Sequence, residues 1–133
     1  MMAEHACVQC GAGDMTHDVR DLSFEYRGRK TVIPRVAGWF CSHCGEIYLD
    51  DAAAYSDAID KFANSIDAEE AAELARVRRK LKLTQVEAAR LTGGGPNAFS
   101  RYEHGKAKPL PAVVNLFKLL NRHPELLEEL RVV

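Results

Sequence analysis

The sequence lacks any long apolar run. No stretch of its 133 residues approaches the roughly 18 consecutive apolar residues that identify a membrane-spanning helix. The N-terminus also lacks a basic segment followed by an apolar one, which is the pattern of a secretory signal peptide. These two absences predict a cytoplasmic protein with no membrane partner.

Cysteine is scarce as well. The chain has 4 cysteines, all in two Cys-x-x-Cys pairs, Cys7 with Cys10 and Cys41 with Cys44, so no odd thiol remains. Without an export signal, these thiols are expected to be reduced, which favours a metal site over disulfides. Two such pairs supply a tetrahedral cage of four thiolates with bonds of about 2.3 Å to Zn²⁺. Because four ligands leave no position for water, we predict one structural zinc ion.

The sequence leaves alternatives for this site. Iron in a rubredoxin-type centre takes the same four ligands, so the residues do not distinguish iron from zinc. His5 and His43 lie near the cysteines in sequence and are alternative ligands, although exposed histidines are the simpler expectation. A redox Cys-x-x-Cys needs the start of a helix in a βαβ setting, and the sequence predicts neither. We therefore expect no enzymatic activity.

The residues between the two cysteine pairs have the patterns of strands. Residues 21–26 alternate between apolar and polar, and residues 31–33 and 36–40 are rich in β-branched and aromatic side chains. A turn at residues 26–30 predicts a hairpin, and Pro34 predicts a sheet edge or a bulge. We expect a small antiparallel sheet that brings the cysteine pairs together and depends on the metal for its folding.

Charge is distributed unevenly along the chain. Residues 1–67 carry 6 Lys/Arg and 11 Asp/Glu, whereas residues 68–133 carry 12 and 8, although the net charge of the whole chain is only −1. This contrast indicates two modules with different partners, and the basic module suits nucleic acid. Arg27, Arg29 and Lys30 form a basic tip on the acidic module, at the predicted turn. An exposed turn beside a strand is a candidate contact surface for another protein.

A connector helix is predicted after the second cysteine pair. Its apolar pattern breaks at residues 64–67, where Asp67-x-x-Glu70 resembles a capping box at the start of a new helix. We therefore place a hinge there. The predicted domains are residues 1–66, which hold the metal site and the connector, and residues 67–133.

The basic half has the pattern of a helix-turn-helix. A helix over residues 68–82 precedes a segment that opens with the capping box Thr84-x-x-Glu87. A Gly-Gly-Gly-Pro break then leads to a short helix over residues 97–104, which ends at Gly105. In such a unit the second helix lies in the major groove of double-stranded DNA.

The predicted recognition helix carries residue types that contact bases. Asn97 and Arg101 are four residues apart and share one face. Arginine reads guanine with two hydrogen bonds, and asparagine reads adenine in the same way. Ser100 is placed for a base or a phosphate, and Gln85 at the start of the preceding helix is placed for a phosphate. The alternative is that these are ordinary exposed residues of a surface helix.

The C-terminal segment is unusually apolar. Residues 110–120 form a broad apolar face, and residues 125–130 form a last short helix. DNA readers with one recognition helix commonly dimerise over a palindrome, so we expect these two helices to form a homodimer interface. The alternative is that they pack only on the core of their own domain. The predicted fold class is α+β, a small zinc-stapled antiparallel β module followed by an all-α helix-turn-helix domain of about five helices.

Two resemblances support this organisation. Residues 83–85 and 97–105 resemble the Cro/CI-type helix-turn-helix family. The two cysteine pairs with residues 26–32 between them, followed by residues 93–103 and 123–127, are similar to the MqsA antitoxin family. This second resemblance covers nearly the whole chain.

The MqsA resemblance implies an antitoxin of a type II toxin–antitoxin system. In that family the zinc-bearing N-terminal domain neutralises an mRNA-cleaving ribonuclease toxin of MqsR type, and the C-terminal domain dimerises and represses transcription on palindromic operator DNA. The acidic N-terminal half suits a basic ribonuclease partner. The alternative function is a stand-alone zinc-containing helix-turn-helix transcriptional regulator. By position, the resemblance implies the zinc ligands Cys7, Cys10, Cys41 and Cys44, and the base readers Asn97 and Arg101.

Overall fold

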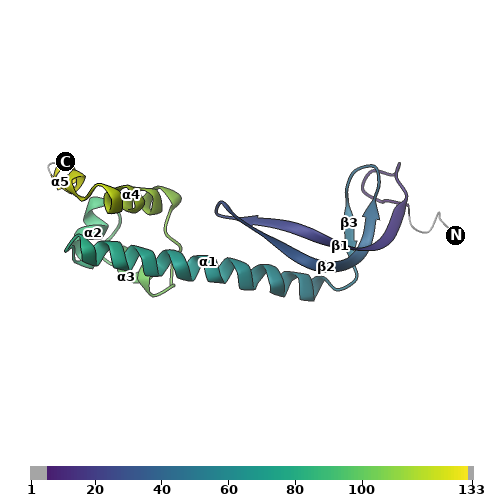
Figure 1. Cartoon of the computed structure of the whole chain (residues 1–133), viewed down its shortest axis with the longest axis horizontal. Coiled ribbons are helices and arrows are strands. Elements are labelled where there is room, and N and C mark those ends of the chain that lie inside the picture. Colours follow the sequence, from purple (N-terminus) through teal and green to yellow (C-terminus); the bar gives the residue numbers. More distant parts are fainter. Residues whose placement is uncertain (1–5, 132–133) are drawn as a thin grey trace. The chain divides into compact units, whose positions relative to one another are not determined.

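The structure is a computed structural model that describes residues 6–131. It divides into two compact units, Met1–Asn64 and Ser65–Val133 (Figure 1). Helix α1 (Ala52–Lys80) begins in the first unit and ends in the second. The predicted order, a small antiparallel sheet followed by a helical unit, is confirmed.

The helix break predicted at residues 64–67 is wrong, because α1 runs through this segment without interruption. The boundary between the two compact units nevertheless falls inside this segment, between Asn64 and Ser65. Asp67 and Glu70, which were predicted to cap a new helix, lie inside α1. Residues 64–67 include weak helix formers but neither glycine nor proline, and the Ala- and Glu-rich residues that follow favour a helix. Ile66 is also buried, with 2% of its surface exposed, so the helical path places an apolar side chain away from water.

The first unit contains a three-stranded antiparallel sheet in the order β1-β2-β3. Its strands are β1 (Met15–Tyr26), β2 (Arg29–Cys41) and β3 (Ile47–Leu49). Arg27 and Gly28 form the two-residue turn between β1 and β2, with φ angles of 49° and 80°. Positive φ at both positions matches the twist of a hairpin, as the sequence predicted for this turn.

A bulge interrupts the pairing of β1 with β2. The register shifts between Arg20 and Leu22, where Pro34 and Arg35 stand in β2. Arg35 has a φ of 53°, and its backbone N–H donates a hydrogen bond of 3.0 Å to the carboxylate of Asp21. The irregularity predicted from Pro34 is therefore confirmed, because the bulge removes the need for a donor at the proline.

The first part of α1 packs beside the sheet. Asp51 caps the helix, since its carboxylate accepts a hydrogen bond of 3.0 Å from the backbone N–H of Ala54. The rings of Phe24 on β1 and Phe62 on α1 meet edge to face, with centroids 6.2 Å apart. Phe62 of α1 thus contacts the hairpin at Phe24.

The second unit contains the C-terminal part of α1 and the remaining helices. α1 ends in a tight turn, where Lys82 has a φ of 60° and the N–H of Leu83 donates to the carbonyl of Arg78 at 3.1 Å. The predicted capping box then begins the next helix, with Thr84 and Glu87 exchanging hydrogen bonds of 3.1 and 2.9 Å. The elements that follow are α2 (Gln85–Leu91), α3 (Ala98–Glu103), α4 (Pro111–Arg122), the 3-10 helix η2 (Pro124–Leu126) and α5 (Leu127–Arg131).

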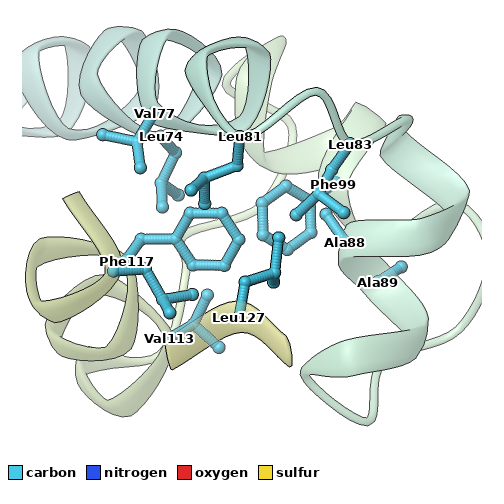
Figure 2. Close-up of a cluster of buried hydrophobic side chains, with 11 residues drawn as sticks. Leu74, Val77, Leu81, Leu83, Ala88, Ala89, Phe99, Val113, Phe117 and Leu127 are labelled. Atoms are coloured by element: carbon cyan, nitrogen blue, oxygen red, sulfur yellow. The ribbon is translucent and has the colours of Figure 1, made fainter. Parts of the chain in front are cut away.

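These helices share one hydrophobic core, shown in Figure 2. Phe99 of α3 is 0% exposed, and its ring lies 5.0 Å from that of Phe117 of α4 and 5.6 Å from that of Tyr102. One face of α3 is therefore fixed inside the unit, which leaves its other face outside. The buried residues are Leu74, Val77, Leu81, Leu83, Ala88, Ala89, Phe99, Val113, Phe117, Leu120 and Leu127.

Candidate metal centre and nucleic-acid interface

The four cysteines meet in the first unit. The Sγ atoms of Cys7 and Cys44 are 3.7 Å apart, those of Cys10 and Cys41 are 3.8 Å apart, and all four lie within 4.8 Å of one another. A tetrahedral site with metal–sulfur bonds of about 2.3 Å has sulfur–sulfur separations of about 3.8 Å. These residues therefore fit a tetrahedral metal ion.

Two backbone turns place the sulfur atoms. In the first, the N–H of Cys7 donates to the carbonyl of Gly13 at 3.0 Å, and the N–H of Gly11 donates to the carbonyl of Cys7 at 2.8 Å. The second follows the end of β2, where the N–H of Gly45 donates to the carbonyl of Cys41 at 3.2 Å. The sheet sets the distance between the turns, because Met15 at the start of β1 pairs with Cys41 at the end of β2.

Backbone N–H groups favour the thiolate forms that a metal requires. The N–H groups of His43 and Cys44 lie 3.4 and 3.5 Å from the Sγ of Cys41. Such bonds are the main cause that lowers the pKa of Cys7, Cys10 and Cys41. A backbone N–H is also the largest influence on Cys44 and lowers its pKa, but desolvation and the three neighbouring sulfur atoms together raise it to about 12. A divalent cation would displace this last proton, because thiolates are the metal-binding form.

Gly13 packs directly against the metal centre, a role that was not predicted because its only signal in the sequence is its nearness to a cysteine pair. A Cβ atom at this position would lie 2.5 Å from the Sγ of Cys41 and 2.7 Å from the Cβ of His43. Trp39 on β2 and Tyr48 on β3 pack around the buried cysteines. The site is therefore enclosed at Cys7 and Cys41, whereas Cys44 is exposed.

Of the two histidines considered as alternative ligands, only His43 lies among the described residues. The group of mutually close ligand atoms found within residues 6–131 consists of the four Sγ atoms, and His43 is not a member. His43 is exposed and contributes its backbone N–H to Cys41 instead. His5 lies outside the described residues.

The predicted base readers lie on the outer face of α3. Asn97 occupies the residue before the helix, a position where asparagine commonly caps, yet its side chain makes no capping hydrogen bond. Arg101 follows one turn later, and both residues are exposed. No carboxylate among residues 6–131 pairs with Arg101, in contrast to Arg76 and Arg78. The structure thus leaves both side chains available to a ligand.

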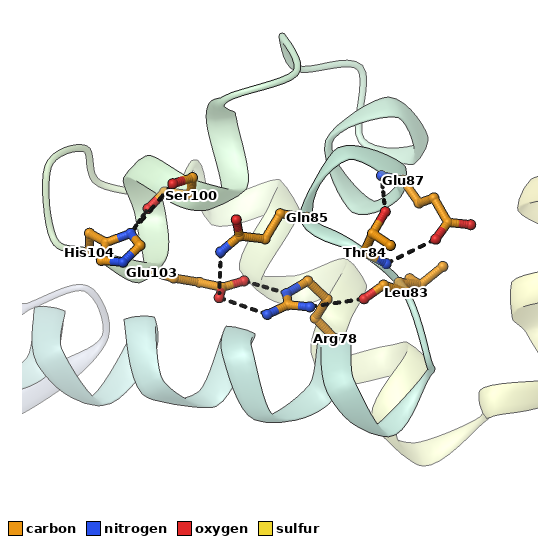
Figure 3. Close-up of polar contacts among 8 residues, drawn as sticks. All are labelled: Arg78, Leu83, Thr84, Gln85, Glu87, Ser100, Glu103 and His104. Atoms are coloured by element: carbon orange, nitrogen blue, oxygen red, sulfur yellow. Dashed lines mark hydrogen bonds and ion pairs between the residues drawn. The ribbon is translucent and has the colours of Figure 1, made fainter.

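The other two predicted DNA contacts take part in internal hydrogen bonds, as Figure 3 shows. Gln85 donates from Nε2 to the carboxylate of Glu103 at 3.1 Å. Ser100 is half-buried, and its Oγ lies 3.4 Å from Nδ1 of His104. The amide of Gln85 still has a second N–H, so the bond to Glu103 fixes the orientation of this side chain without using all of its donors.

An ion pair fixes α3 to α1. Arg78 donates to the carboxylate of Glu103 from Nε at 2.6 Å and from Nη2 at 3.0 Å, and from Nη1 to the carbonyl of Leu83 at 2.9 Å (Figure 3). Only 12% and 6% of the two side chains are exposed. Burial acts to raise the pKa of Glu103, but the hydrogen bonds from Arg78 and Gln85 outweigh it and the pKa is lowered. Neither partner was predicted to have a role, because a pair separated by 25 residues has no local signal.

The basic tip of the first unit lies at the turn of the β1–β2 hairpin. Arg29 and Lys30 are exposed, and Arg27 is half-buried. These three residues therefore lie at one end of the hairpin, where the predicted turn placed them.

The chain combines a four-sulfur metal site in a small β unit with a helix-turn-helix in a helical unit. These two features together define the class: a metal-site β module joined to a helix-turn-helix module. A profile of the family described as the antitoxin component of bacterial toxin–antitoxin systems, MqsA, matches residues 5–131. Antitoxin MqsA of Escherichia coli (strain K12) is 42% identical over 129 residues, which cover 94% of this chain and 98% of that protein. This chain belongs to the MqsA antitoxin family, as its motifs predicted.

Similarity to a solved structure was found as well. That structure is the N-terminal domain of the E. coli protein MqsA, with 31% sequence identity and a TM-score of 0.45, and the match covers 47% of this chain and 96% of that one. Within the described part of this chain, no helix combines the length and the apolar composition that crossing a membrane requires.

Proposed function

We propose that this antitoxin neutralises an mRNA-cleaving toxin of MqsR type through its metal-bearing first unit. We also propose that it represses transcription by binding palindromic operator DNA as a homodimer. It would act in the cytoplasm and without enzymatic activity. Membership of the MqsA family supports the toxin partner. The observation that carries the DNA-binding proposal is the outer face of α3, where Asn97 and Arg101 are exposed and unused by the fold.

The packing of α3 supports its use as a recognition helix. Phe99 anchors the helix in the core, and Glu103 ties its end to Arg78 of α1. A helix held on two sides presents its outer residues in a fixed orientation, which bidentate contacts to bases require. Arg101 would read guanine and Asn97 would read adenine. Gln85 would contact a phosphate, and Ser100 a base or a phosphate.

The metal centre supports the first unit as a binding module. Cys7, Cys10, Cys41 and Cys44 would hold one Zn²⁺ ion, which supplies a structural cross-link when bound. Four sulfur ligands saturate a tetrahedral ion and leave no position for a substrate or a water molecule. This donor set therefore favours a structural role over a catalytic one.

The toxin-binding surface is proposed to include the hairpin tip of Arg27, Arg29 and Lys30. The turn presents Arg29 and Lys30 to solvent, where they are placed to meet carboxylates of a partner. The acidic balance of residues 1–67 would attract a basic ribonuclease over longer distances.

The homodimer is proposed to form through the C-terminal helices. α4 buries Val113 and Phe117 in the core of its own unit. Outside this face, Leu119 is 48% exposed, and Leu110 before the helix is 64% exposed. The apolar surface of this region thus exceeds what the unit's own core uses, which supports a contact with a second copy.

The DNA-binding proposal is tested by comparing two substitutions in the full-length protein. Arg101→Ala should lose discrimination against the wrong base by about 1–3 kcal/mol, whereas Gln85→Ala should weaken specific and non-specific duplexes alike. Affinities for the chain's own promoter DNA and for a scrambled duplex, measured at one salt concentration, give both quantities. An Arg101→Ala protein that binds promoter DNA as tightly as the parent would refute the assignment of α3.

The proposed toxin neutralisation is tested with a purified ribonuclease toxin of MqsR type. The parent should bind it and inhibit its cleavage of RNA, and the double variant R29A/K30A should bind it more weakly with unchanged DNA affinity. Lys61→Ala on the exposed side of α1 is the matched control for loss of a positive charge in the same unit. If the parent neither binds nor inhibits the toxin, the proposed neutralisation is wrong.

A further inference from the structure

A groove lies beside the outer face of α3, in the second unit. Its volume is about 370 Å³. It extends along the same side of the helix that presents the two proposed base readers. Its lining includes Pro96, Asn97, Ala98, Arg101, Tyr102 and Ala107.

The chain after α3 builds one wall of this groove. Gly105 has a φ of 72°, which turns the chain back along the helix. The N–H groups of Lys106 and Ala107 then donate to the carbonyl of Arg101 at 2.8 and 3.3 Å. Ala107 is therefore held at a fixed distance from the backbone of a proposed base reader.

The groove combines apolar walls with polar side chains at its rim. The proline ring, the two alanine methyl groups and the Tyr102 ring supply carbon surface, and the Tyr102 ring is fixed by its edge-to-face contact with Phe99. Asn97 and Arg101 supply the polar groups. Carbon surface of this kind suits neither a phosphate nor the hydrogen-bonding edge of a base.

The major groove of DNA presents one apolar group that fits these walls. Thymine carries a methyl group at C5, and alanine or aromatic side chains contact it in protein–DNA complexes. We infer that the groove receives the 5-methyl group of a thymine that neighbours the base contacted by Arg101. This inference rests on the proposed DNA binding. It adds a determinant of specificity that involves no hydrogen bond.

The position of the groove and the charge around it support this occupant. The groove is continuous with Asn97 and Arg101, so a duplex seated on these residues brings the next base pair over the apolar walls. Residues 68–133 carry 12 Lys/Arg and 8 Asp/Glu, which favours a polyanion over an apolar peptide. A 5-methylcytosine would present the same methyl group, so the experiment must separate these two pyrimidines.

The test replaces single thymines by uracil in the promoter duplex that the full-length protein protects in footprinting. Uracil keeps every hydrogen bond of thymine and lacks only the methyl group. One thymine beside the guanine that Arg101 contacts should weaken binding about fourfold when replaced, which corresponds to the burial of one methyl group. Unmethylated cytosine at this position should bind more weakly still, and 5-methylcytosine should recover only the methyl-dependent part.

A variant that fills the groove completes the test. Ala107→Val leaves Asn97 and Arg101 in place and should abolish the difference between the thymine and uracil duplexes. Ala72→Val, on an exposed position of α1, should preserve this difference. If uracil binds as well as thymine at every position while promoter binding persists, the inference is wrong and the proposed DNA binding stands. If no promoter duplex binds, the proposed DNA binding itself fails.

Discussion

The two units of this chain are stabilised in different ways. In the first unit, the cluster around the metal centre has three buried residues, Cys7, Met15 and Cys41, and two of these are predicted metal ligands. In the second unit, eleven buried apolar residues form one cluster. A metal can substitute for a hydrophobic core when the chain is too short to form one. The first unit should therefore depend on its metal, and the second should not.

The largest expected effect is the loss of the metal. Chelation of zinc, or Cys41→Ser, should unfold the first unit, because zinc binding contributes on the order of 10 kcal/mol to the folding of such small modules. The second unit should retain its structure and its thermal transition. Trp39 is the chain's single tryptophan and packs on the cysteine cluster, so its fluorescence reports on the first unit alone. Circular dichroism at 222 nm follows the helices.

Ser42→Ala provides a matched control for this prediction. Ser42 is exposed and lies beside Cys41, so the change tests the same turn without removing a ligand. It should leave the zinc content and the fluorescence of Trp39 unchanged. If chelation abolished the thermal transition of the second unit as well, the contrast between the two units would be refuted.

A smaller effect is expected from the ion pair in the second unit. Glu103→Gln leaves the Arg78 guanidinium, 12% exposed, without its counter-charge, which should cost about 3 kcal/mol of stability. Glu73→Gln is the matched control, since Glu73 pairs with Arg76 at 2.6 Å but both side chains are about half exposed. An exposed pair contributes about 0–1 kcal/mol. Urea denaturation followed at 222 nm measures both values, and equal losses would contradict the role of burial.

The ion pair of Arg78 and Glu103 also predicts that the stability of the second unit depends on pH. The folded-state pKa of Glu103 is lowered relative to an unfolded-state value of about 4.3. Its contribution to stability is therefore complete above that value and is lost as the pH falls through the lower folded-state pKa. Glu103→Gln should flatten the acid limb of the stability profile of the second unit. Glu73→Gln should flatten it less, because Arg76 also lowers the pKa of Glu73 but solvent screens this half-exposed pair.

Local patterns predicted much of this structure. The cysteine spacing, the hairpin turn at Arg27 and Gly28, the bulge at Pro34 and the cap at Thr84 each depend on residues close together in the sequence. Asn97 and Arg101 were found in the same way, because helical periodicity places them on one face. Their outer position is confirmed, while their contact with DNA stays a prediction.

Features that depend on tertiary contacts were not predicted. Weak helix formers at residues 64–67 predicted a break in the helix, but burial of Ile66 and the helix-favouring residues that follow keep α1 continuous. The bond from Arg78 to Glu103 joins elements far apart in sequence. Glu103 also accepts a hydrogen bond from Gln85, a residue that was predicted only to contact DNA.

The smallest expected effect is a change in zinc affinity when one methyl group is added. One glycine in each unit is replaced by alanine for this comparison. Gly13→Ala would place a Cβ 2.5 Å from the Sγ of Cys41, so the ligand must move, and zinc affinity should fall about tenfold. The φ of Gly13 lies outside the range that disfavours alanine, so the effect isolates the clash from backbone strain. Gly95→Ala in the second unit is the matched control, since no atom lies within 4 Å of its added Cβ.

Competition with a chromophoric zinc chelator measures both proteins. Gly95→Ala should keep the zinc affinity of the parent and should leave the second unit as stable or slightly more stable, because alanine restricts the unfolded chain. Gly13→Ala should weaken zinc binding without changing the urea midpoint of the second unit. Equal zinc affinities in the two variants would show that the first turn can yield around the sulfur atoms. The metal centre would then be less rigid than the close contact of Gly13 with Cys41 implies.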